Sequence, residues 1–88
     1  MKIIYTKHVL EEKIPLMKAL GWNVTKFRIN QTIKKPDWVG LTKYGQPTAM
    51  SLVDKKHILR VVFEKEHDII RIITAHIARR GTYESTKN

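Results

Sequence analysis

The sequence predicts an α+β domain in which two N-terminal helices pack on a curled, mainly antiparallel β-sheet. Apolar residues recur at helical spacing in the first half of the chain, whereas the second half consists of short β-prone runs separated by turn residues. The chain has 88 residues, of which 42% are hydrophobic, which suffices for one small core. We therefore expect a single domain over residues 1–84, followed by a disordered tail at 85–88.

The N-terminal segment predicts a strand that leads into a helix. The run KIIYT at 2–6 is β-prone, and Leu10, Ile14 and Met17 then recur at helical spacing. Pro15 lies inside this pattern and lacks a backbone donor. The helix is therefore expected either to kink at the proline or to consist of two pieces.

A second helix is expected at about 24–34. Asn23 or Thr25 can cap its N-terminus, and the proline that follows the helix stops it. Phe27 and Ile33 are expected to face the core, and the basic residues of the helix to be mostly solvated.

The second half of the chain predicts further strands. Residues 38–54 are typical of a strand, a loop and another strand, and HILRVVFE at 57–64 and DIIRIITA at 68–75 are two clear strands. A hairpin with the four-residue turn KEHD would pair Glu64 with Ile69.

That register continues back along the hairpin and sorts its side chains onto two faces. It pairs Arg60 with Ile73 and Leu59 with Thr74. The face expected to lie against the helices carries Leu59, Val61, Phe63, Ile70, Ile72 and Thr74. The other face carries Arg60, Val62, Arg71 and Ile73.

The charge of the chain indicates a polyanionic partner. It has 17 Lys and Arg against 8 Asp and Glu, a formal net charge of +9, which favours nucleic acid or an acidic protein over membrane lipid. No apolar run approaches the roughly 20 residues that cross a bilayer, and the N-terminus becomes charged too early for a signal peptide. We expect a cytoplasmic protein with no membrane contact.

Several classes of chemistry lack support in the sequence. The absence of cysteine excludes disulfides, thiolate metal sites and cysteine nucleophiles, and the four histidines are not at metal-binding spacing. No Gly-rich phosphate loop, serine elbow or carboxylate dyad is present. We therefore expect no metal and no cofactor.

Two arginines on the less apolar face of the hairpin are candidates for phosphate recognition. Arg60 and Arg71 would project from a rigid sheet, and a guanidinium can grip a phosphate bidentately and stabilise the charge that develops during strand cleavage. The alternative is that they keep this face soluble and pair with Glu64, Glu66 or Asp68.

The end of the last strand adds a cluster of polar residues: His76, Arg79, Arg80 and Tyr83. Histidine is the usual general acid or base near neutral pH, and tyrosine can donate a proton or stack on a base. These groups suffice for metal-free RNA cleavage. A basic C-terminus can equally bind phosphate without cutting it.

Other residues have weaker indications. Lys7 and His8 lie where the first strand becomes a helix, and His8 can be either a site residue or an ordinary first-turn residue. Trp22 and Trp38 flank the second helix and are expected to pack in the core or at its rim rather than to stack on bases. No role is assigned to His57 or His67.

The order of motifs resembles the RelE-like toxin superfamily. It begins with YTKHV opening a helix, continues with GWNVTKFRINQTIKKPD as a second helix closed by Pro-Asp, and ends with IRIITAHIARRGTYE. The resemblance is closest to the BrnT toxins and to a related family of small uncharacterised domains. The residues that match the BrnT ending are Arg71, Ala75, Ala78, Arg79, Arg80, Tyr83 and Glu84. His76 stands where BrnT proteins usually carry arginine.

The resemblance implies a β-α-α-β-β-β fold and the toxin of a type II toxin-antitoxin system. Such a toxin is a metal-free endoribonuclease that cleaves mRNA, in some cases on the ribosome, and an acidic antitoxin covers its site. By this hypothesis Arg60, Arg71 and His76 are catalytic. The substrate contacts are Lys7, His8, Arg79, Arg80 and Tyr83. The alternatives are a non-catalytic nucleic-acid-binding domain and a basic subunit that docks an acidic protein.

Overall fold

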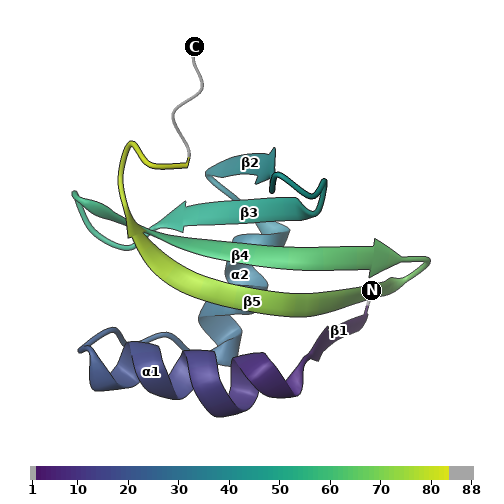
Figure 1. Ribbon diagram of the computed structural model, residues 1–88, viewed down its shortest axis with the longest axis horizontal. Helices are drawn as coiled ribbons and strands as arrows, with labels where there is room; N and C mark the ends of the chain where they lie inside the picture. Colours follow the sequence, from purple (N-terminus) through teal and green to yellow (C-terminus); the bar gives the residue numbers. More distant parts are fainter. Residues whose placement is uncertain (1, 84–88) are drawn as a thin grey trace.

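The fold is a five-stranded mixed sheet with helices on one face, seen in a computed structural model that describes residues 2–83 (Figure 1). The elements are β1 (Lys2–Tyr5), η1 (Val9–Lys13), α1 (Ile14–Ala19), α2 (Lys26–Lys34), β2 (Trp38–Leu41), β3 (Pro47–Leu52), β4 (His57–Glu66) and β5 (Ile69–Arg79). The strand order is β1-β5-β4-β3-β2. The predicted α+β class is confirmed, with one strand more than the order β-α-α-β-β-β. Glu84 and the expected tail at 85–88 lie outside the described residues.

The first helix consists of two pieces, one of the two alternatives expected from Pro15. A π-helical turn, η1, runs directly into α1, and Pro15 is the second residue of α1. Pro15, which lacks a backbone donor, falls where π-helical hydrogen bonding changes to α-helical hydrogen bonding. The two-piece helix therefore accommodates Pro15. No helix within residues 2–83 is long and apolar enough to cross a membrane.

The second helix begins at its predicted cap but buries a different face. The hydroxyl of Thr25 accepts a hydrogen bond from the backbone N–H of Arg28 at 3.2 Å. Ile29 is fully buried, and Ile33 packs partly against the core. The expectation for Phe27 is wrong, because this side chain is 69% exposed. Two residues before Ile29, it lies about 200° around the helix from it.

The β4–β5 hairpin has a shorter turn than predicted. Glu66 pairs with Ile69, so the turn consists of the two residues His67 and Asp68. His67 adopts a φ of 55°, a left-handed conformation that histidine tolerates better than most residues. The expected register was wrong by two residues: Glu64 lies opposite Arg71 rather than Ile69.

A β-bulge then changes which face of the sheet the side chains in the second half of β5 occupy. Phe63 pairs with Ile72 and Val62 with Thr74, which leaves Ile73 as the extra residue. Thr74 therefore lies on the helix-free face with Val62, and its expected place against the helices was wrong. Beyond the bulge, Arg60 lies opposite His76 rather than Ile73.

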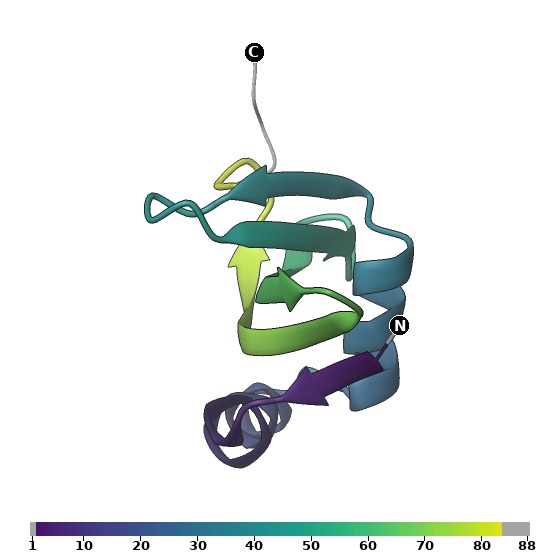
Figure 2. The same cartoon turned by 90° about the vertical axis from the view of Figure 1, so that its right-hand side faces the viewer.

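Both faces of the sheet are partly buried. The core under the helices contains Val9, Met17, Val24, Ile29, Leu59, Val61, Ile70, Ile72 and Ala75. On the other face Met50, Ile58 and Val62 are also buried. The sheet curls, and the segment after β5 folds back toward β2, where the Arg80 guanidinium lies 5.4 Å from the centroid of the Trp38 ring (Figures 1 and 2).

Candidate functional site

Three of the predicted site residues meet on the helix-free face of the sheet. Arg60 on β4 and His76 on β5 are cross-strand neighbours, and Tyr83 follows β5. The Arg60 guanidinium carbon lies 4.0 Å from the centroid of the Tyr83 ring, and the rings of His76 and Tyr83 meet edge-on with centroids 5.6 Å apart. We call these three residues the Arg60 cluster.

The Arg60 side chain is half-buried and has one donor without a partner among residues 2–83. Its Nε is buried and has no hydrogen-bond partner in the described part of the chain. The ion pairs found within residues 2–83 do not include it. Its visible partner is the face of Tyr83, which attracts a cation but accepts no strong hydrogen bond. The accessible part of the guanidinium can bind an acceptor such as a phosphate oxygen.

His76 is held as a neutral base. Burial lowers its pKa from the ordinary value of 6.5, and the positive charges of Arg60 and Lys13 lower it further. A histidine with a lowered pKa is deprotonated at neutral pH and can accept a proton. The Arg60 cluster therefore combines a cation, a proton acceptor and a phenol.

A cavity of about 520 Å³ opens beside the Arg60 cluster. Its walls include Arg60, Thr74 and Tyr83 together with Lys43 and Tyr44 from the β2–β3 hairpin. Tyr44 is 79% exposed, and the Lys43 ammonium lies 5.2 Å from the centroid of its ring. An exposed aromatic face beside a cation is typical of single-stranded nucleic-acid binding.

Sequence reasoning overlooked Lys43, Tyr44 and Lys13. The hairpin tip TKYG carried a usable signal, because an aromatic residue next to lysine and glycine in a turn is expected to be solvent-exposed. The sequence gave no such signal for Lys13, because its proximity to His76 depends on how the helix packs against β5.

Arg71 lies apart from the cluster. It faces Glu64, with 3.9 Å between Arg71 Nη1 and Glu64 Oε1, and both side chains are about half exposed. Glu64 is four residues from Arg60 along β4, or roughly 13 Å at the usual strand rise. The structure thus separates the two arginines that the sequence suggested as a joint clamp, and Arg71 makes the pairing with Glu64 expected of a solubilising residue.

The remaining predicted residues lie at the start of the first helix and at the end of β5. His8 Nε2 lies 3.3 Å from the hydroxyl of Thr74, a wall residue of the cavity, and its Nδ1 lies 3.6 Å from Glu12. Lys7 is exposed at the start of the helix. Arg80 lies over Trp38, and Arg79 is exposed at the end of β5.

Neither a metal site nor a similarity to known proteins helps to define the site further. Within residues 2–83, no three histidine or carboxylate side chains are grouped so that they could hold a metal ion. No protein-family model, curated protein or solved structure matches this chain. The functional argument therefore rests on the geometry of the Arg60 cluster and its cavity.

Proposed function

We propose that the protein is a metal-free endoribonuclease that cleaves mRNA, a RelE-like toxin closest to the BrnT toxins. The observation that carries the proposal is the Arg60 cluster. In it, an arginine whose Nε is buried without a hydrogen-bond partner among residues 2–83 lies with a histidine of lowered pKa and a tyrosine. RNA cleavage without a metal requires these three kinds of group. The cavity beside them offers Tyr44 and Tyr83 as surfaces for bases.

Each residue of the cluster has a distinct role in this mechanism. His76 accepts the proton of the ribose 2′-hydroxyl, whose oxygen attacks the adjacent phosphorus. Arg60 binds the non-bridging oxygens and stabilises the negative charge of the phosphorane. Tyr83 gives its proton to the leaving 5′-oxygen as the P–O bond breaks. The products are a 2′,3′-cyclic phosphate and a free 5′-hydroxyl.

Substrate binding would itself activate the base. In the free protein the charge of Arg60 helps to keep the pKa of His76 low. A bound phosphate neutralises that charge and raises the affinity of His76 for a proton when the 2′-hydroxyl is in place. Arg71, which is paired with Glu64, contributes at most a distant contact with the RNA.

An acidic antitoxin is part of the same proposal. The net charge of +9 attracts an acidic protein as well as RNA. A partner that covers the cavity between the β2–β3 hairpin and Tyr83 would compete with RNA for Arg60.

The proposal is tested by inducible expression in a bacterial host, with growth and total RNA integrity followed together. Wild type should arrest growth and cleave RNA, whereas Arg60→Ala and His76→Ala should abolish both, since a general base alone contributes roughly 10²- to 10⁴-fold. Arg71→Ala is the matched control, because it removes an arginine from the same face and should leave most of the activity.

Folded protein, checked by circular dichroism, is required of every variant. Full activity of His76→Ala would disprove the assigned base, and equal losses in Arg60→Ala and Arg71→Ala would disprove the assigned clamp. Intact RNA with wild type that nevertheless binds RNA would identify a nucleic-acid-binding domain instead of a nuclease.

A further inference from the structure

A second groove, lined in part by His76, lies beside the later half of β5. β1 pairs only with Ile69–Ile72 of β5, so within the described residues the later half of β5 has α1 rather than a strand beside it (Figure 1). The space between α1 and this half of β5 has a volume of about 400 Å³, within the range of pockets that hold small ligands. We call it the α1 groove.

The walls of the α1 groove combine apolar surface with positive charge. Leu16 and Leu20 of the first helical segment line it and are 49% and 67% exposed, which is unusual for leucine beside a core. Trp22 lines it as well, and Lys13 and Arg79 supply two cations. The described lining residues include no carboxylate. This chemistry suits a ligand with a flat apolar part and a negative charge, as a nucleotide has.

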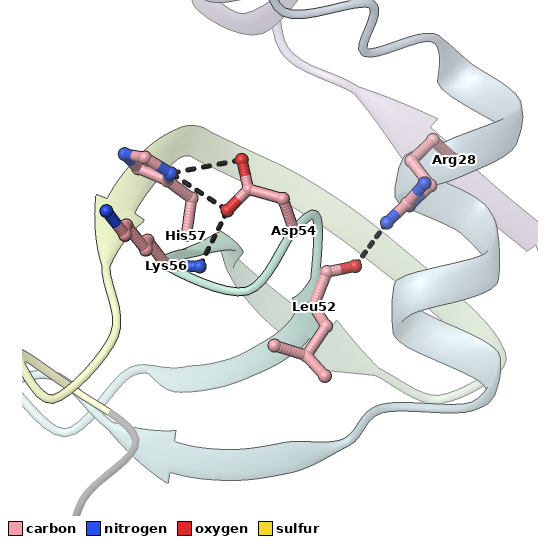
Figure 3. A network of polar contacts seen from close by, with 5 residues as sticks. All are labelled: Arg28, Leu52, Asp54, Lys56 and His57. Carbon is pink, nitrogen blue, oxygen red and sulfur yellow. Dashed lines mark hydrogen bonds and ion pairs between the residues drawn. The ribbon is translucent and has the colours of Figure 1, made fainter.

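His57 is an oriented hydrogen-bonding group in this groove. Its Nδ1 lies 2.9 and 3.2 Å from the two carboxylate oxygens of Asp54, which also accepts a hydrogen bond from the backbone N–H of Lys56 at 2.7 Å (Figure 3). The second ring nitrogen points away from Asp54 (Figure 3). The Trp22 ring lies against the His57 ring, with centroids 4.8 Å apart and the planes tilted by 57°. A carboxylate that holds Nδ1 leaves Nε2 to meet a ligand.

His76 joins the α1 groove to the Arg60 cluster. It lines the groove and is also the cross-strand neighbour of Arg60. From His76 to Arg79 is three residues of β5, or about 10 Å. A chain whose phosphate sits at Arg60 can therefore continue past His76 into the groove.

We propose that the α1 groove is a second subsite for the same RNA strand and holds the nucleotide next to the cleaved phosphate. Its base contacts Trp22 and Leu20, its phosphate binds Lys13 and Arg79, and His57 donates to or accepts from the sugar or base edge. This inference rests on the proposed function for RNA binding, but not for cleavage. It makes the substrate a single strand longer than one nucleotide.

The histidine ring signals test this subsite directly. Two-dimensional ¹⁵N–¹H spectra of the labelled protein would be recorded while a 2′-O-methyl octanucleotide, which lacks the attacking hydroxyl, is added. The signals of both His57 and His76 should shift with one common affinity. His67, in the β4–β5 turn, is the internal control and should not move.

The outcomes separate this inference from the proposed function. A shift of His76 without His57 would overturn the subsite and leave the RNA site at Arg60 intact. No shift of either signal would overturn both proposals. If His57 responds only to an acidic amphipathic peptide, the groove takes a protein segment and the RNA subsite is wrong.

A matched pair of lysines on the first helix gives an independent measurement. Lys13→Gln should weaken octanucleotide binding about 3- to 10-fold and reduce the salt slope by roughly 0.7, because one phosphate contact is lost. Lys18→Gln removes the same charge from a position outside the groove lining and should change affinity less than 2-fold. Equal effects of the two substitutions would overturn the subsite.

Discussion

At the scale of single residues, the positive charge of Arg60 helps to lower the pKa of His76. Burial is the main reason that the pKa of His76 is lowered, and the charges of Arg60 and Lys13 add to it. The protonated form of His76 is thus disfavoured in the folded protein. In an unfolded chain the histidine returns to a pKa near 6.5.

Replacing Arg60 by glutamine should therefore raise the pKa of His76 toward, but not to, 6.5, because burial remains. An NMR titration of the histidine rings measures this directly, with Lys65→Gln as a control on the distant end of β4. An unchanged pKa in Arg60→Gln would mean that the two side chains are farther apart in solution.

The lowered pKa also has a consequence for stability. Between the folded pKa of His76 and about pH 6.5, the unfolded state binds a proton that the folded state does not, so stability rises with pH through this window. Stability is lost as pH falls below 6.5. His76→Gln should flatten that part of the profile, measured by urea unfolding at several pH values. A slope as steep as that of wild type would assign it to other groups.

At the scale of elements, the face that α2 buries is decided by its packing on β3 and β4. Ile29 is buried in the core, and the hydroxyl of Thr32 lies 2.7 Å from that of Ser51 on β3. Phe27 is instead exposed beside a surface hollow that Leu52 also lines. The largest apolar side chain of the helix is thus not a core residue.

Two substitutions in α2 test this orientation. Ile29→Ala should lower the free energy of unfolding by about 2–5 kcal/mol, because it opens a cavity in the core. Phe27→Ala should change it by less than about 0.5 kcal/mol, as expected at an exposed position. Urea denaturation of both variants provides the measurement. A larger loss for Phe27→Ala than for Ile29→Ala would mean that the helix is rotated about its axis.

At the scale of the whole molecule, the positive charge is spread over the surface, whereas the Arg60 cluster is local. The net charge of +9 supplies long-range attraction for any polyanion. Specific contacts then depend on the cavity beside Arg60 and the α1 groove. The long-range attraction and the specific contacts should therefore respond differently to salt and to mutation.

RNA affinity should consequently fall steeply with salt. Contact with three or more phosphates predicts a log-log slope steeper than about −2 for single strands. Fluorescence anisotropy of a labelled octanucleotide between low and physiological salt gives this slope. Binding that does not depend on salt would contradict a phosphate-based interface. An equal affinity for double-stranded RNA of the same length would contradict the role given to Tyr44 and Tyr83 as base-stacking surfaces.

The sequence alone was enough to place the helices and most strands and to give the charge. It narrowed the cap of the second helix to Asn23 or Thr25, and the first helix to a kink or two pieces at Pro15. It also gave Arg60, His76 and Tyr83 as candidate site residues, together with five others: Lys7, His8, Arg71, Arg79 and Arg80. These are local properties, since helical spacing, β-propensity and capping depend on neighbours in the chain.

Only the tertiary structure decided which of these residues meet. The two-residue turn at His67 and the bulge at Ile73 set the register of β4 and β5, and both bring Arg60 opposite His76. They also leave Arg71 with Glu64 at the other end of the hairpin. The turn at His67 lacks the Asn-Gly or Asp-Gly pair that marks two-residue hairpins, and a bulge depends on the partner strand, so neither is visible in the local pattern. Strand pairing is a non-local choice, and it determines which side chains form the site.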